Sequence, residues 1–205
     1  MATETTMKEH GVAEQSAKER IIASAVRLFC EKGYEATPVR AIVESAGVTK
    51  PVLYYYFENK EMLFRSIVSE AMRESLEQLT RVCMAPCHDF RQHLEAIGHV
   101  FFQAARERPH FVRFIHAVAF SGLYDGVFDF RGYWRGLLER ISWVFEPAQK
   151  KGLLREDLPA RTMAMHFTEI VISAMREKVY FPELWDDAQA ERGVVQIVME
   201  GIGPR

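Results

Sequence analysis

Residues 37–60, T-P-V-R-A-I-V-E-S-A-G-V-T-K-P-V-L-Y-Y-Y-F-E-N-K, are the stretch that decides the fold. Thr37 and the proline after it are typical of a helix start, with a hydroxyl cap and a first turn that needs no amide donor. Gly47 predicts the end of that helix, because glycine readily adopts the left-handed conformation of a C-cap. Thr49, with a proline two residues later, repeats the start signal. We therefore predict two short helices joined by a tight turn, the geometry of a helix-turn-helix.

Three consecutive tyrosines, Tyr54–Tyr56, distinguish this segment from a helical hairpin inside an all-α core. Successive residues on a helix point about 100° apart, so one core cannot bury all three rings. Leu53 and Phe57, four residues apart, are the expected inward positions. We expect at least two of the three phenols to lie near the surface, where they can donate to phosphate oxygens of DNA.

The segment therefore predicts DNA contacts of two kinds. Lys50 and Tyr54 are the candidates for base edges, and Thr37, Thr49, Tyr56 and Lys60 are the candidates for phosphates. The full predicted DNA-binding set is Thr37, Val48, Thr49, Lys50, Pro51, Val52, Tyr54, Tyr55, Tyr56 and Lys60.

The same residues resemble the tetracycline-repressor (TetR) family of bacterial transcriptional regulators. The similarity covers roughly residues 16–64 and lies in A-G-V-T-K-P-V-L-Y-Y-Y-F-E-N-K-E-M-L-F and in the preceding A-V-R-L-F-C-E-K-G-Y-E-A-T-P-V-R-A-I. Where the family commonly has Thr or Ser, this chain has Val52, which replaces a hydroxyl contact with a methyl contact, for example to thymine. The resemblance implies a homodimer whose C-terminal domain binds a small effector.

The remainder of the chain is predicted to be helical, and no strand alternation of useful length occurs, so the fold class is all-α with about nine helices. A capping box at Ser16 starts the first helix, which should end near Gly33. Later helices are expected over about 60–80, from 90, from 109, from 130 with Pro147 kinking or shortening its end, over 160–181 and from 187. Residues 1–15 are expected to be a disordered arm, 16–62 the helix-turn-helix domain, and 63–205 the effector-binding and dimerisation domain.

Composition agrees with a cytoplasmic regulator. The formal net charge of the 205-residue chain is −2, and 48% of its residues are hydrophobic. From residue 16 to 65, eight cations and six anions leave a local excess of two positive charges. The first 15 residues carry no apolar signal-peptide core, and no run of about 18 apolar residues could span a membrane. Three cysteines, an odd number, fit a reducing compartment.

Cys83, Cys87 and His88 form the one cluster that suggests other chemistry. It can be a metal or redox site, or a linker between helices that contains two thiols. A C-x3-C pair is not the usual zinc spacing, and no second cysteine pair follows. The chain also lacks a Gly-rich phosphate loop, an HExxH motif and a nucleophile elbow. We expect no enzyme activity, catalytic residue, metal or cofactor.

The helix predicted over 160–181 has an unusually wide apolar surface. Its polar positions form one narrow stripe: Thr162, His166, Glu169, Ser173 and Arg176. Such a helix is expected to contact both its own domain and a partner, although a helix buried in its own core would show the same periodicity. The predicted dimer interface consists of Ile170, Val171, Met175, Val194, Val195 and Val198.

The predicted effector cavity lies between the helices from residue 90 to 181. An aromatic and methionine-rich lining suits an apolar or planar ligand, although each residue can equally be ordinary core. His116 and His166 are candidate polar anchors, and a solvated position is favoured for His166. The candidate lining residues are Phe101, Phe114, Phe120, Trp134, Leu138, Met163 and Phe167.

Together these patterns predict a ligand-responsive, homodimeric DNA-binding regulator. We expect a repressor that a small apolar or aromatic effector releases from a near-palindromic double-stranded DNA operator. Two alternatives belong to other classes of protein. One is a helical protein that sequesters a ligand without binding DNA, and the other is a small-molecule enzyme that uses Cys83, Cys87 or His88.

Overall fold

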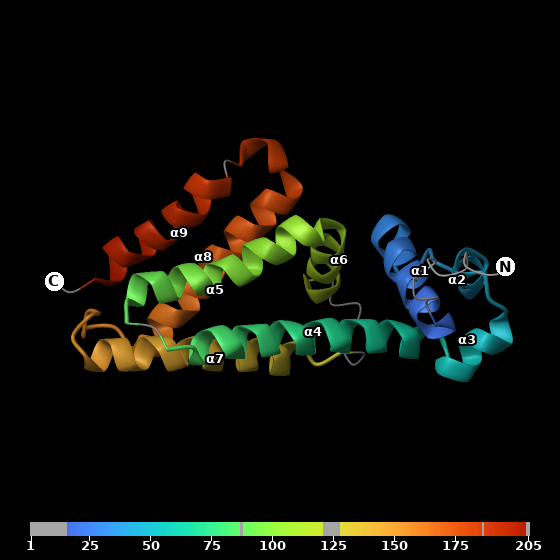
Figure 1. The fold of residues 1–205 in the computed structure, drawn as a ribbon, viewed down its shortest axis with the longest axis horizontal. Coiled ribbons are helices and arrows are strands. Elements are labelled where there is room, and N and C mark those ends of the chain that lie inside the picture. The colour runs from blue at the N-terminus through green and yellow to red at the C-terminus, as the bar shows by residue number, and fades with distance from the viewer. Residues whose placement is uncertain (1–15, 87, 121–127, 186, 204–205) are drawn as a thin grey trace, which may run out of the picture. The chain divides into compact units, whose positions relative to one another are not determined.

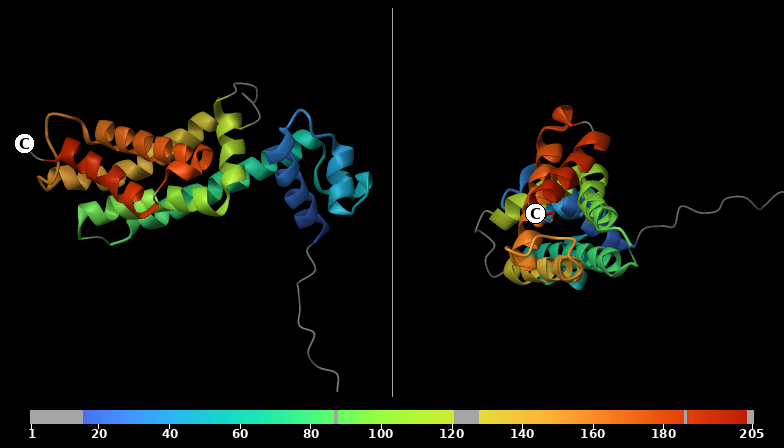
Figure 2. Two further views of the ribbon diagram at one scale, coloured as in Figure 1. Left: turned by 90° about the horizontal axis from the view of Figure 1, so that it is seen from above. Right: turned by 90° about the vertical axis from the view of Figure 1, so that its left-hand side faces the viewer.

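The computed structural model describes residues 16–86, 88–120, 128–185 and 187–203, and every regular element in this part of the chain is a helix (Figures 1 and 2). The predicted all-α class is confirmed. The predicted arm at 1–15 lies outside the described residues. The elements are α1 (Ala17–Lys32), α2 (Val39–Ala46), α3 (Lys50–Tyr56), α4 (Lys60–Met84), α5 (Phe90–Glu107), α6 (Pro109–Phe120), α7 (Phe130–Lys150), α8 (Ala160–Tyr180), η1 (Pro182–Leu184) and α9 (Asp187–Ile202).

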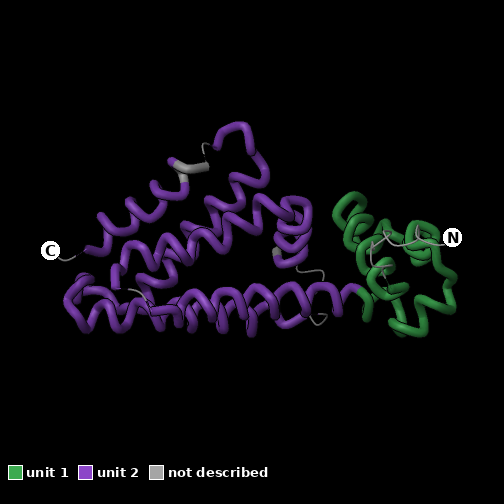
Figure 3. Tube along the Cα trace, viewed as in Figure 1, with its two compact units in different colours: residues 1–63 green, residues 64–205 purple. Residues whose placement is uncertain are grey.

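The chain forms two compact units, residues 1–63 and residues 64–205 (Figure 3). Unit 1 contains α1, α2 and α3, and unit 2 contains the helices from α5 to α9. Helix α4 begins in unit 1 and continues into unit 2, so it is the covalent connection between them.

Unit 1 is a three-helix cluster in which α1 packs against both α2 and α3. The capping box predicted at the start of α1 is confirmed, since the amide of Glu19 donates to Ser16 Oγ at 3.2 Å and the amide of Ser16 donates to Glu19 Oε2 at 2.8 Å. One fully buried side chain from each helix meets in the core, namely Ile21, Ile42 and Leu53, each 0% exposed. The buried faces therefore follow the predicted helical spacing.

The turn between α2 and α3 depends on Gly47. This residue has φ +62° and ψ +39°, the left-handed conformation predicted for it. The amide of the next residue, Val48, donates to the carbonyl of Val43 at 3.0 Å and closes the turn. A glycine is needed here because an L side chain costs about 1–2 kcal/mol in this backbone region.

Unit 2 is built around α8, which packs against α5, α6, α7 and α9. Its core contains phenylalanine rings from three helices that lie close to one another. The ring of Phe145 on α7, 0% exposed, lies 5.3 Å from the ring of Phe90 and 5.8 Å from the ring of Phe167. Burial of such side chains contributes roughly 1.5–3 kcal/mol each, so this cluster is a principal source of stability for unit 2.

Helix α4 is joined to the body of unit 2 by polar contacts. The hydroxyls of Ser75 and Tyr133 lie 3.2 Å apart, and the guanidinium of Arg140 donates to Thr80 Oγ1 at 2.7 Å. Burial raises the pKa of the Tyr133 phenol, and the hydrogen bond with Ser75 opposes that rise. These contacts fix the position of α4 against α7.

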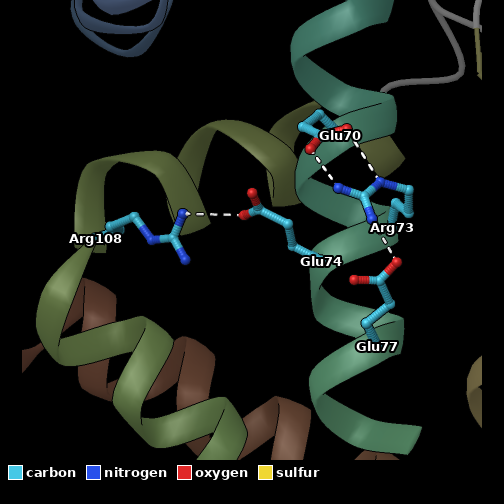
Figure 4. A network of polar contacts seen from close by, with 5 residues as sticks. All are labelled: Glu70, Arg73, Glu74, Glu77 and Arg108. Atoms are coloured by element: carbon cyan, nitrogen blue, oxygen red, sulfur yellow. Dashed lines mark hydrogen bonds and ion pairs between the residues drawn. The ribbon is translucent and has the colours of Figure 1, made fainter.

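A second set of contacts on α4 is ionic and exposed (Figure 4). The guanidinium of Arg73 bridges the carboxylates of Glu70 and Glu77 along α4. The carboxylate of Glu74 lies 3.9 Å from the guanidinium of Arg108, which follows α5. Exposed ion pairs of this kind contribute little, about 0–1 kcal/mol each, so they orient α4 more than they stabilise it.

One predicted helix end is wrong. Helix α4 continues to Met84 instead of ending near residue 80, so Cys83 lies in its last turn and not in a linker. Helix α7 continues past Pro147 to Lys150, because proline removes only one hydrogen bond near the end of a helix. Among the described residues, no helix combines the length and the apolar character needed to cross a membrane.

The left-handed conformation of Gly47 leads to a prediction about the stability of the protein. Replacing Gly47 by alanine should lower the free energy of unfolding by about 1 kcal/mol, because a Cβ there meets no atom within 4 Å and only the backbone conformation is strained. Gly193, inside α9 with equally open space and no left-handed φ, is the control. Gly193→Ala should raise the free energy of unfolding by roughly 0.5–1 kcal/mol. Denaturant titration of both variants would contradict this account if the two changes had the same sign.

Candidate nucleic-acid interface

Helix α3 presents its three tyrosines to the surface of unit 1. Tyr54, Tyr55 and Tyr56 are 48%, 82% and 39% exposed, while Leu53 and Phe57 are buried. The expectation of at least two surface phenols is confirmed. The ring of Tyr55 meets the ring of Tyr56 edge to face at a centroid distance of 5.0 Å, which orients these two side chains relative to each other.

The N-terminal end of α3 carries the other predicted contacts. Thr49, Lys50 and Pro51 are exposed, whereas Val48 and Val52 are half-buried. Thr49 is the N-cap, but its hydroxyl makes no capping hydrogen bond, so the predicted hydroxyl cap is wrong. An uncapped helix N-terminus leaves amide N–H groups that can donate hydrogen bonds to an anion such as phosphate.

Thr37 does not belong to this surface, and its predicted phosphate contact is corrected. The residue is 0% exposed, and its hydroxyl donates to the carbonyl of Gly33 at 2.7 Å and to that of Leu28 at 3.2 Å. Helix α2 begins after it, with Pro38 as the N-cap. Thr37 therefore ties the α1–α2 connection to the end of α1 instead of capping α2.

Lys60 is also engaged within unit 1. Its ammonium donates to the carbonyls of Tyr34 at 3.0 Å and Thr37 at 3.2 Å, and it lies 4.2 Å from the centre of the Tyr34 ring. These contacts leave little of the ammonium for DNA, so the predicted phosphate role of Lys60 is corrected to a structural one. The neighbouring Asn59 caps the start of α4, since its Oδ1 accepts from the amide of Met62 at 2.8 Å.

Arginines of unit 1 are committed to internal contacts as well. Arg20 Nε donates to the carbonyl of Ala46 at 3.2 Å, which ties α1 to the end of α2. Arg40 pairs with Glu44 at 2.6 Å, and the hydrogen bond that its guanidinium donates to this carboxylate raises the pKa of the guanidinium. Lys50, by contrast, makes no hydrogen bond or ion pair with another described side chain. It is the cation of α3 that is open to a ligand.

The residues predicted to bind an effector lie in unit 2 in different settings. Phe101, Met163 and Phe167 belong to the main core cluster. Phe114 and Leu138 are buried outside that cluster, and Trp134 is half-buried. The side chain of Phe120 lies outside the described residues. The first three residues are therefore part of the core, and Trp134 is the most accessible of the described candidates.

The two histidines considered as polar anchors differ in environment. His166 is exposed, as expected. His116 is half-buried on α6, and burial together with the nearby Arg176 guanidinium lowers the pKa of its imidazole. Its ring centre lies 6.1 Å from that of Tyr180.

Four of the six residues predicted at a dimer interface are buried inside their own unit. Val171, Val194, Val195 and Val198 are each less than 9% exposed and belong to the core cluster, so their assignment to an interface is corrected. Ile170 is 36% exposed and Met175 is half-buried. Two exposed apolar side chains are absent from the predicted interface, namely Met165 of α8 and Ile197 of α9, which is 65% exposed.

The cysteine and histidine cluster is not assembled in the described part of the chain. Burial raises the pKa of the Cys83 thiol to about 12, and the nearby Arg140 opposes the rise only weakly. A thiol with such a pKa is a poor nucleophile at neutral pH. Cys87 lies outside the described residues, and no group of three His, Cys, Asp or Glu side chains that could hold a metal occurs among those described.

Comparison with protein families matches residues 21–67 to the N-terminal domain of the "Bacterial regulatory proteins, tetR family". The match spans α1, α2, α3 and the beginning of α4. Over the full chain, the sequence is 24% identical to the HTH-type transcriptional regulator RutR of Escherichia coli K12, with 100% of this chain and 98% of RutR covered.

Solved structures share the fold. SmeT, the repressor of the Stenotrophomonas maltophilia multidrug efflux pump SmeDEF, superposes with a TM-score of 0.74 at 21% identity, covering 92% of this chain and 91% of SmeT. SmeT has also been solved as a complex with triclosan. FadR of Bacillus subtilis, in complex with stearoyl-CoA, superposes with a TM-score of 0.73 at 19% identity, covering 89% of this chain and 98% of FadR.

Replacing Thr37 and replacing Thr49 should affect the stability of the protein very differently. Thr37→Val keeps the shape of the side chain but removes a buried donor with two acceptors, and it should lower the free energy of unfolding by about 1–3 kcal/mol. Thr49→Val, at an exposed site without a side-chain cap, should change it by less than about 0.5 kcal/mol. Chemical denaturation followed by circular dichroism measures both. A larger loss for Thr49→Val would restore its predicted capping role.

Proposed function

Because this chain is a transcriptional regulator of the tetR family, we propose that it acts as a homodimeric repressor which a small apolar or aromatic effector releases from its operator. The observation that carries the DNA-binding part is α3, where Lys50 and three exposed tyrosines project from a helix held by the buried side chain of Leu53. A rigid helix with exposed donors is what reading of the major groove requires.

The proposed contacts follow from exposure on α3. Lys50 and Tyr54 are assigned to base edges, where an ammonium or a phenol can reach acceptors in the major groove. Thr49, Tyr55 and Tyr56 are assigned to phosphates, with the uncapped N-terminus of α3 as an additional donor. Pro51 starts α3, while the methyl groups of Val48 and Val52 lie close enough to the surface for apolar contacts.

The proposed dimer places two copies of α3 on two half-sites. A twofold axis makes the operator a near-palindrome with half-sites about one helical turn of DNA apart, or somewhat more. The partner surface is assigned to the exposed apolar side chains of α8 and α9, which are Met165, Ile170 and Ile197. Ile170 lies between the exposed His166 and the half-buried Ser173, so this surface includes the polar stripe of α8.

The effector is proposed to bind unit 2 among α5, α6, α7 and α8. Support comes from the aromatic side chains that line this region and from two proteins of the same fold that are solved with triclosan and with stearoyl-CoA. One conformation of the dimer fits the operator and another does not. Release requires that the effector have the higher affinity for the conformation that does not fit the operator. Helix α4, which connects the two units, is the element that would transmit the difference.

An enzymatic role is not proposed. The relatives with sequence similarity over the full chain are transcriptional regulators, and Cys83 is a buried thiol of high pKa. A regulator of this kind acts where the bacterial chromosome is, so we place the protein in the cytoplasm.

The first experiment is selection of random duplex DNA against the purified protein, followed by affinity measurements over a range of salt concentrations. The proposal predicts enrichment of a near-palindrome. Lys50→Ala should then weaken binding to it by about 1–3 kcal/mol and relax the preference at one position of each half-site. Lys150→Ala, which removes an exposed charge at the end of α7, is the control and should change neither affinity nor preference.

Two results would contradict this assignment. If no sequence is enriched from the folded, ligand-free protein, the alternative of a ligand-sequestering protein without DNA activity is favoured. If Lys50→Ala weakens all sequences equally and lowers the salt slope by about one per subunit, Lys50 is a phosphate contact and not a base contact.

The proposed dimer surface makes a separate prediction. Ile197→Glu should shift the protein from dimer to monomer, because an exposed isoleucine at an interface would be replaced by an unpaired, desolvated charge. Leu153→Glu, at a residue 45% exposed in the α7–α8 connection, is the control and should leave the dimer intact. Analytical ultracentrifugation measures both. Dissociation by neither variant, or by both, would remove Ile197 from the interface.

A further inference from the structure

A surface groove of about 680 Å³ runs along α5 in unit 2, with α4 as one wall and α9 as the other. In Figure 1, α5 lies between α4 and α9. The lining residues of α5 extend from Glu95 to Gln103, so the groove follows this helix for about 12 Å. A volume of this size is within the range of small-molecule sites in proteins. None of the residues predicted to bind an effector lines it.

A glycine keeps the floor of the groove open. Gly98 lies in the middle of the 18-residue helix α5, where glycine costs roughly 0.5–1 kcal/mol relative to alanine. Its backbone does not adopt a left-handed conformation, and the nearest atom to an added Cβ would be in the ring of Phe102, at 3.7 Å, an ordinary contact. Neither the backbone nor a close neighbour therefore requires glycine at this position. Its effect is to leave space above the ring of Phe102.

The apolar part of the groove is formed by side chains from all three helices. Val82 on α4, Phe102 on α5 and Val195 on α9 line it, and Phe102 and Val195 are almost fully buried. A ligand with an apolar body can therefore rest on a surface that is already rigid, which lowers the entropic cost of binding.

The charged part of the groove favours an anion. Glu191 is already paired with Arg106, and the imidazole of His99 lies 3.7 Å from the same carboxylate. The remaining charged lining groups are Arg81 and Arg192, on opposite walls, and Glu95 on the floor. These three side chains make no hydrogen bond or ion pair with other described residues. Two guanidinium groups against one carboxylate leave a single positive charge for a ligand to match.

From this arrangement we propose that the groove between α4, α5 and α9 binds a small amphiphile with an apolar body and one anionic group. The body lies over Gly98 and Phe102, and the anionic group meets Arg81 or Arg192. The site is separate from the proposed dimer surface, because none of the residues assigned to that surface, Met165, Ile170 and Ile197, lines the groove. It is also independent of DNA binding, so the two proposals fail separately.

The test uses the full chain without DNA and 8-anilinonaphthalene-1-sulfonate, which has an aromatic body and one sulfonate, as the probe. The expected result is saturable fluorescence with one probe per chain. In the double variant Arg81→Gln and Arg192→Gln, affinity for this probe should fall roughly fivefold, as expected for loss of a surface charge interaction. Affinity for neutral N-phenyl-1-naphthylamine should stay the same. Lys150→Gln with Arg161→Gln is the charge-matched control and should change neither.

A second variant fills the groove without removing a charge. Gly98→Leu should weaken binding of both probes at least tenfold, while the Tm stays equal to or above that of the parent, since leucine is the better helix former. Equal affinity of parent, Gly98→Leu and the double arginine variant for the sulfonate probe would overturn the proposal, because the probe would then bind elsewhere. Absence of saturable binding to the parent would overturn it too.

Discussion

Carbonyl oxygens at helix ends are the constraint on which unit 1 depends. The last carbonyls of a helix have no partner within it, and burying them unpaired is costly. Two side chains satisfy such groups here, since Thr37 reaches back to the end of α1 and Arg20 reaches from α1 to the end of α2. Lys60 similarly donates to two carbonyls of the α1–α2 connection. Each contact joins two elements, so the angle between the helices, and with it the position of α3, depends on hydrogen bonds as well as on the small apolar core.

This use of cations changes how an acidic regulator can bind DNA. The sequence offers a local excess of only two positive charges, and Arg20, Arg40 and Lys60 are engaged in contacts of the protein with itself. A DNA phosphate that binds one of these three side chains would have to compete with the carbonyl or carboxylate that the side chain already contacts. Neutral donors on α3, namely the phenols, Thr49 and the backbone amides at its start, must therefore supply a large share of the contacts. Such contacts release fewer counterions, so the salt dependence of binding should be modest.

The sequence predicts the fold well where a local signal has one physical meaning. Glycine at residue 47 can only end α2 in a left-handed turn, and three adjacent tyrosines cannot all be buried, so both features are confirmed. Thr37 and Lys60 were misassigned because a hydroxyl or an ammonium can satisfy either a phosphate or a carbonyl. The Thr37 hydroxyl has one acceptor only four residues away, the carbonyl of Gly33. The two carbonyls that Lys60 binds, those of Tyr34 and Thr37, lie 26 and 23 residues away and are brought close only by the fold, so spacing along the chain could not reveal them. The groove along α5 was missed for the same reason, since its walls come from helices about 100 residues apart.

The apolar periodicity of α8 and α9 also could not predict which residues form a dimer interface. An apolar face indicates that a helix is covered, but it does not say whether the cover is the same chain or a second copy. Val194, Val195 and Val198 are covered by unit 2 itself, and Ile197, on the other side of α9, is left exposed. A polar substitution at one of the three valines would detach α9 from α5 and lower stability whether or not a dimer exists. Only residues whose side chains are exposed in the single chain can report on assembly, because only their substitution changes the association without first changing the fold.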